Sequence, residues 1–194
     1  MSADNVNFVH LRVHSEYSIA DSIIKIKDLA AATMDQGMPA LALTDRCNLF
    51  GMLKFYSACL EHGVKPIIGA DLRYRVDADR VDSNRVDSNR ANADSFRLGV
   101  LAMNEKGYRN LIQLVSAAYV ASSTRGVLTS AQIFAHSDGL IALSAGRDGE
   151  IGQALLAGDG ATARAVAQCW AQEFDQRFYL ELSRTGRPGD DAQA

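Results

Sequence analysis

Residues able to bind ions or transfer protons lie where predicted strands end. His14 closes the alternating segment 8–14, which predicts a strand. Asp45 directly follows the apolar run 39–44, and Asp71 lies in the next strand-like run. Imidazole and carboxylate groups are common ligands of metal ions in proteins. In folds built of strand–helix units, chemistry takes place at the carboxyl ends of the strands, so these side chains are the first candidates for a functional site.

Strand-like and helical segments alternate along the chain. The predicted strands cover 8–14, 39–44, 65–76, 96–103, 139–144 and 177–182, and the predicted helices cover 23–37, 49–63, 104–120, 150–157 and 160–173. Alternation with short connections predicts βα units and a largely parallel sheet or barrel, which is an α/β fold. Trp170 and Phe174 lie four residues apart on a predicted helix and are expected in its core.

One segment, 75–94, breaks this alternation. It consists of four near-copies of a five-residue unit, RVDAD, RVDSN, RVDSN and RANAD. A period of five matches neither a helix face nor a strand face, and the arginines and aspartates nearly cancel in charge. The segment is therefore predicted to be an expanded surface loop between two strands.

Composition narrows the class of protein further. The chain has 194 residues, of which 47% are hydrophobic, so it has the length and the apolar content of one folded domain. The net charge of −3 argues against a free-standing nucleic-acid binder, whose surface would be basic. Neither a signal peptide nor an apolar run long enough to span a bilayer is evident, so a cytoplasmic location without a membrane partner is expected.

Several motifs, in order, resemble the PHP (polymerase and histidinol phosphatase) domain family. They are FVHLRVHSEYSIAD, ALTDRCNLFGMLKFY and GVKPIIGAD, followed by NEKGYRNLIQLVSAAY, GLIALSAGRDGEIG and RFYLELSRTGRP. The sequence is most similar to the domain at the N-terminus of the alpha subunit of bacterial DNA polymerase III, in its proteobacterial form. This resemblance spans 1–194 apart from the repeat, and implies a distorted barrel of about seven βα units. The last of those units would lie beyond Ala194, so an incomplete barrel is expected.

The resemblance also implies a cluster of three metal ions, which in active members hydrolyses phosphoesters. His14, Asp21 and Asp71 match ligand positions of that cluster. Other ligand positions carry residues that do not bind metals, namely Arg12, Arg46, Arg97 and Gly146. Arginine stays protonated at any working pH and therefore cannot coordinate a metal. A final Asp-x-His pair would lie beyond the chain. Neither a catalytic residue, nor a bound metal, nor another cofactor is therefore expected.

The substituted arginines suggest what replaces the metals. Carboxylates crowded at a strand end repel one another unless positive charge neutralises them. Arg12, Arg46 and Arg97 carry permanent charges and a fork of donors that fits a carboxylate. Ion pairs with Asp21 and Asp71 are therefore predicted in the former metal site.

The resemblance implies a non-catalytic module of a replicative DNA polymerase. Such a module supports the rest of the alpha subunit, docks the proofreading exonuclease subunit, and meets DNA only within the full holoenzyme. The parent protein resembles a DNA-directed DNA polymerase, a nucleotidyltransferase whose catalytic carboxylates are not in this chain, so whether the chain is itself an enzyme stays open. Two alternatives remain: a metal-dependent phosphoesterase or 3′–5′ exonuclease, and a non-functional fragment. The DNA that follows codon 194 separates the last alternative from the others.

Limited proteolysis tests the prediction for the repeat. If 75–94 is a polar surface loop, trypsin should cut the native protein first at Arg75, Arg80, Arg85 or Arg90. Mass spectrometry of the earliest fragments identifies the site. Protection of all four arginines would show that the segment is packed.

Overall fold

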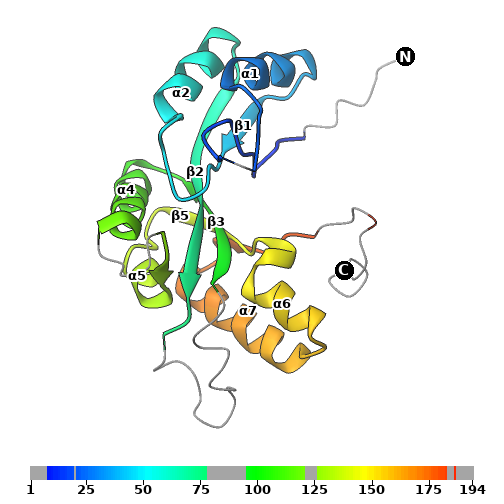
Figure 1. The fold of residues 1–194 in the computed structure, drawn as a ribbon, viewed down its shortest axis with the longest axis vertical. Coiled ribbons are helices and arrows are strands. Elements are labelled where there is room, and N and C mark those ends of the chain that lie inside the picture. Colours follow the sequence, from blue (N-terminus) through cyan, green and yellow to red (C-terminus); the bar gives the residue numbers. More distant parts are fainter. Residues whose placement is uncertain (1–7, 20, 78–94, 121–125, 183–185, 187–194) are drawn as a thin grey trace. The chain divides into compact units, whose positions relative to one another are not determined.

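The structure is a computed structural model that describes residues 8–19, 21–77, 95–120, 126–182 and 186. The chain divides into two compact units, Met1–Asp71 and Leu72–Ala194. They are drawn in blue to cyan and in cyan-green to red in Figure 1. Strand β2 (Lys65–Arg75) contributes residues to both units.

In its described residues, the first unit is built from two helices and two paired strands. Its elements in order are α1 (Ile26–Asp35), β1 (Ala40–Leu43), α2 (Met52–Glu61) and the first part of β2. Strand β1 pairs with β2 in parallel, from Ala40 opposite Lys65 to Leu43 opposite Ile68. All four residues of β1 are buried, as a continuous apolar strand predicts. One core joins α1, β1 and α2, with members Ile26, Ala30, Leu41, Leu43, Phe55, Ala58, Cys59 and Val64.

The second unit carries more helices and a mixed set of strands. Its elements after β2 are β3 (Phe96–Ala102), α4 (Glu105–Val120), β4 (Leu128–Thr129), α5 (Ser130–Ala135), β5 (Leu140–Leu143), the 3-10 helix η2 (Gly146–Asp148), α6 (Glu150–Leu156), α7 (Gly160–Phe174) and β6 (Phe178–Tyr179). Trp170 and Phe174 of α7 are 3% and 0% exposed, which confirms their prediction as core residues. Tyr74 packs edge-to-face on Trp170, with ring centroids 5.2 Å apart.

The predicted α/β class is confirmed, but one predicted strand is irregular. Within 8–14, the carbonyl groups of His10 and Val13 accept from the amides of Ala42 and Thr44 at 2.9 and 2.8 Å. The segment therefore lies along β1, although only the pair His10–Leu41 forms a bridge. The regular ladder stops because the hydroxyl of Thr44, rather than a carbonyl group, accepts from the amide of Val13.

Strand direction also differs from the prediction of a largely parallel sheet. Strand β3 pairs with β5 in antiparallel fashion, whereas β5–β6 and β2–β4 are parallel. Over the described residues of each unit, the pairing does not return to its first strand, as an incomplete barrel implies. The predicted strand 177–182 is regular only over Phe178–Tyr179, because the amide of Glu181 donates to the hydroxyl of Ser144 at 2.9 Å.

The first residue of the predicted loop 75–94 belongs to a strand. Arg75 is the last residue of β2 and lies opposite Thr129 of β4. Asp77 is also used structurally, since its carboxylate accepts from the hydroxyl of Ser130 at 2.8 Å and from the amide of Ala131 at 2.7 Å. Asp77 thereby caps the start of α5. The rest of the predicted loop, 78–94, lies outside the described residues.

Candidate functional site

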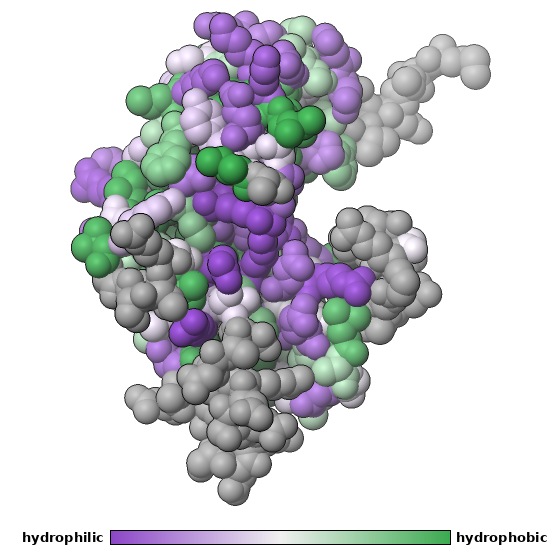
Figure 2. Space-filling view, in the orientation of Figure 1, coloured by the Kyte–Doolittle hydropathy of each residue, from purple (hydrophilic) through white to green (hydrophobic). Residues whose placement is uncertain are grey.

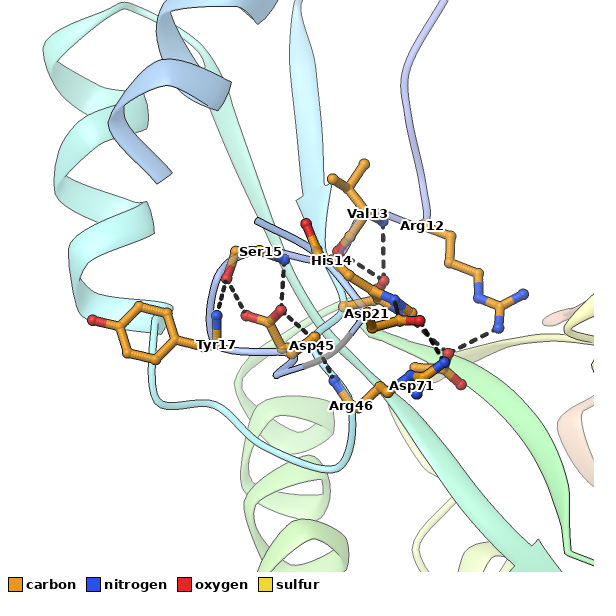
Figure 3. A network of polar contacts seen from close by, with 12 residues as sticks. Arg12, Val13, His14, Ser15, Tyr17, Asp21, Asp45, Arg46 and Asp71 are labelled. Carbon is orange, nitrogen blue, oxygen red and sulfur yellow. Dashed lines mark hydrogen bonds and ion pairs between the residues drawn. The ribbon is translucent and has the colours of Figure 1, made fainter. Parts of the chain in front are cut away.

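Three segments of the first unit meet beyond the carboxyl end of β1 (Figure 3). They are the end of the N-terminal extended segment, the residues directly after β1, and Asp71 in β2. The parallel register of β1 and β2 continues past β1, because Arg46 bridges to Asp71. The amide of Asp71 donates to the carbonyl of Asp45 at 3.1 Å, and the amide of Cys47 donates to the carbonyl of Asp71 at 2.9 Å. The backbone therefore holds Arg46 and Asp71 side by side.

Asp71 is a buried carboxylate that contacts one guanidinium group and one imidazole ring. It is 1% exposed. Arg12 Nη2 lies 2.8 Å from its Oδ2, and His14 Nε2 lies 3.1 Å from the same oxygen. A buried carboxylate is costly unless it is paired and hydrogen-bonded. Arg12 and His14 come from the N-terminal extended segment, so they tie that segment to β2.

Asp21 is the second carboxylate of the cluster and lies in the loop that precedes α1. Arg46 Nη2 lies 2.6 Å from Asp21 Oδ1, and His14 Nδ1 contacts Asp21 Oδ2. His14 therefore faces Asp21 through one ring nitrogen and Asp71 through the other.

Asp45 is buried beside this cluster and is held by neutral donors. It is 1% exposed. The amide and hydroxyl of Ser15 donate to it at 2.7 and 2.8 Å, and the hydroxyl of Ser18 donates at 2.6 Å. The amide of Arg46 in turn donates to Ser18 Oγ at 3.0 Å. Asp45 thus anchors the loop that carries Asp21.

Sequence reasoning placed Asp45 at a strand end but missed this anchoring role. Ser15 and Ser18 flank the bend after His14, and a carboxylate directly after a buried strand needs nearby donors. Those two serines supply such donors, but nothing in the sequence ties them to Asp45. Their contact with Asp45 joins residues about 30 positions apart, which no local pattern reveals.

The donor set does not fit the metal cluster that the family resemblance implies. Both oxygens of Asp21 and the Oδ2 oxygen of Asp71 are engaged by guanidinium groups and by the His14 ring. In the described part of the chain, no group of three or more His, Cys, Asp or Glu side chains is arranged to hold a metal ion. Guanidinium groups neutralise the carboxylates, but they have no lone pair with which to coordinate a metal ion.

Of the predicted site residues, the first unit brings five together. Two of the predicted ion pairs are present, Arg12–Asp71 and Arg46–Asp21, and His14 contacts both carboxylates.

Two further predicted positions belong to the second unit. Arg97 lies in β3, and Gly146 begins η2. A pairing of Arg97 with Asp21 or Asp71 stays a prediction.

Comparison with known proteins defines the class. Residues 10–185 match the PHP domain family, and the chain therefore belongs to that family. Among curated proteins, it is 39% identical over 189 residues to the DNA polymerase III subunit alpha of Pseudomonas fluorescens, and 40% identical over 188 residues to that of Pseudomonas aeruginosa. It is 38% identical over 187 residues to the subunit of Escherichia coli K12. These matches cover 95–96% of this chain but only 15% of each relative. This PHP domain is thus homologous to one region of a much longer polymerase subunit.

Two solved structures also match. One is an amidohydrolase from Chromobacterium violaceum, at 16% identity and a TM-score of 0.41, covering 57% of this chain and 33% of that chain. The other is described as a metal-dependent phosphoesterase from Bifidobacterium adolescentis, at 12% identity and a TM-score of 0.48, covering 93% and 88%. Separately, none of the helices in the described residues has the length and apolar content needed to cross a membrane.

The two ion pairs should differ in their contribution to stability. Arg12→Ala would leave the buried Asp71 without its guanidinium partner, and should lower the free energy of unfolding by about 3 kcal/mol. Arg46→Ala breaks a pair whose side chains are 39% and 23% exposed, and should cost about 1 kcal/mol or less. Urea unfolding of the parent and both variants measures the difference.

Lys54→Ala provides the matched control. Lys54 pairs with Glu16 at 3.0 Å on the surface of the same unit, with side chains 44% and 32% exposed. Its removal should leave the free energy of unfolding close to that of the parent, because an ion pair exposed to water contributes little to stability. An Arg12→Ala variant as stable as the Lys54→Ala variant would show that the cluster does not hold the strand ends together.

Proposed function

We propose that this chain is a non-catalytic PHP module of a bacterial replicative DNA polymerase. In this role it supports the polymerase polypeptide and docks the proofreading exonuclease subunit. The observation that carries the non-catalytic part is the pairing of Arg12 with Asp71 and of Arg46 with Asp21. These carboxylates match ligand positions of the family's metal site, and the arginines stand where further ligands would be.

The chemistry of the cluster supports a structural role. Catalysis by the family's metals depends on lowering the pKa of a bound water molecule and on polarising a phosphate. A guanidinium group neutralises a carboxylate but has no open coordination position for water. The cluster of this chain therefore links the N-terminal segment, the loop before α1 and β2 through ion pairs and hydrogen bonds.

The family relationship supports the context of replication. The relatives named above are polymerase subunits, and the chain spans about 15% of their length. In this proposal, polymerase activity belongs to the part of the subunit outside this domain. The net charge of −3 agrees with a module that meets DNA only within the assembled holoenzyme. A working phosphoesterase would need ligand-rich strand ends, which Arg12 and Arg46 do not provide.

Metal analysis tests the non-catalytic role. Purified protein should contain no stoichiometric zinc, manganese or iron, because the carboxylates that match ligand positions are engaged by guanidinium groups. Elemental analysis by mass spectrometry, before and after dialysis against each metal, measures the amount of each metal bound per protein chain. Adding Mn²⁺ should leave the melting temperature unchanged, since a ligand stabilises only a state that binds it. One equivalent or more of tightly held metal would overturn the proposal.

Binding measurements test the docking role. A full-length subunit that carries this domain should bind the proofreading exonuclease of the same organism at micromolar or lower concentration. Calorimetry at low and at moderate salt measures the affinity and separates specific docking from charge attraction. If no binding is detected at either salt concentration, the docking role is contradicted and only the supporting role remains.

A further inference from the structure

The backbone amides of β1 and of the residues after it point alternately to two neighbours. Those of Ala42 and Thr44 donate to the N-terminal extended segment, at 2.9 and 2.8 Å. Because successive amides of an extended chain point to opposite sides, those of Asp45 and Cys47 are expected to face β2. The amide of Cys47 does so, since it donates to the carbonyl group of Asp71 at 2.9 Å.

The ladder between β1 and β2 is interrupted. Its regular part ends with Leu43 opposite Ile68, and the pairing resumes in the same register where Arg46 bridges to Asp71. The interruption is therefore a local gap in the ladder rather than a shift of one strand along the other.

The amide of Asp45 falls in this gap. A regular parallel ladder would pair it with the carbonyl group of Gly69, just as the amide of Cys47 pairs with that of Asp71. Within the residues that the structure describes, no backbone carbonyl group accepts from the Asp45 amide. Asp45 is 1% exposed, so its amide is shielded from bulk water. A buried amide without a hydrogen bond costs free energy, and a partner is therefore expected.

A small cavity lies at the same place. Its lining includes Leu43 and Asp45 from the end of β1, Ile68 and Gly69 from β2, and Met52 at the start of α2. Its volume is about 10 Å³, close to that of a single water-sized sphere. Figure 2 shows hydrophilic and hydrophobic residues mixed at the surface of the first unit, whereas the side chains around the cavity are mainly apolar. The cavity therefore has room for one small molecule and offers it few polar partners.

We infer that the first unit binds one internal water molecule in this gap, between the amide of Asp45 and the carbonyl group of Gly69. Water fits because its oxygen accepts from the amide while one of its hydrogens donates to the carbonyl group. A cation would be repelled by the amide hydrogen, and an anion by the carboxylate of Asp45 and the carbonyl oxygen of Gly69. A neutral molecule that both donates and accepts meets neither obstacle.

The water molecule has a structural consequence for the cluster. It continues the ladder from the Leu43–Ile68 pair to the Arg46–Asp71 bridge, and that bridge keeps two residues of the cluster side by side. The site belongs to the first unit itself and goes beyond the proposed function. Neither the metal content of the protein nor its affinity for the exonuclease bears on it.

A crystal structure of the protein, at a resolution that shows ordered water, tests the site. The expected result is one density peak within hydrogen-bond distance of both the amide nitrogen of Asp45 and the carbonyl oxygen of Gly69. An empty cavity, or a direct hydrogen bond between these two groups, would overturn the inference. An ion at this place, recognised by its coordination distances, would overturn it as well.

Nuclear magnetic resonance tests the same site in solution. The amide proton of Asp45 should show a cross-peak to water with the sign of a water molecule that is held in place. The amide of Leu43 is the matched control, because it belongs to the regular ladder and should show no such peak. A missing peak at Asp45, or an equal peak at Leu43, would contradict the inference.

The serine hydroxyl groups near Asp45 set a limit on the interpretation of that peak. Ser15 and Ser18 donate to the Asp45 carboxylate, and their hydroxyl protons exchange with water. A peak at Asp45 together with an empty cavity in the crystal would come from these hydroxyl groups, and would overturn the inference. A peak at Asp45 together with the ordered water molecule in the crystal supports it.

Discussion

The buried carboxylate of Asp71 is the constraint around which the first unit is arranged. At 1% exposure it has lost almost all contact with water, which costs several kcal/mol unless positive charge and donors replace the water. Arg12 and His14 supply both from a segment more than 50 residues away in sequence. The pairing of that segment along β1 and the ion pair at Asp71 therefore support each other. Without the backbone contacts, Arg12 would not reach Asp71, and without Arg12 the buried carboxylate would lose that guanidinium partner.

Asp45 shows a second way to bury a carboxylate. It uses hydroxyl and amide donors from Ser15 and Ser18, all within one loop, and no guanidinium group. Several hydrogen bonds to the charged form of a carboxylate stabilise it without a formal counter-charge. The same loop carries Asp21. The hydrogen bonds of Ser15 and Ser18 to Asp45 therefore also position the carboxylate that Arg46 and His14 contact. The two networks join at Arg46, whose amide contacts Ser18 and whose guanidinium group contacts Asp21.

Arginine and a divalent metal ion solve the same electrostatic problem with different chemical consequences. Both neutralise carboxylates that would otherwise repel one another at a strand end. Only the metal has open coordination positions that can activate water. A guanidinium group can therefore hold strand ends together at a site where it cannot activate water. Function in such a family follows from the residues at the site rather than from the fold.

The sequence by itself determined the features that local patterns encode. Helical periodicity and glycine stops predicted α1, α2, α4 and α7 to within a few residues, because side-chain spacing and caps act within a few turns. Complementary charge at family positions predicted the pairs of Arg12 and Arg46 with carboxylates. The capping box of Thr129 and Gln132, which starts α5, was also present in the sequence and was missed.

The tertiary structure alone decided how distant segments combine. It set the antiparallel direction of β3 and β5, the irregular pairing of 8–14 along β1, and the burial of Asp45 against Ser15 and Ser18. An apolar run predicts a buried strand but carries no information on its direction or neighbour. Likewise, a polar residue is satisfied by whichever donors the fold brings to it, and those donors lie far along the chain. Packing between distant segments, rather than local periodicity, therefore defined the cluster.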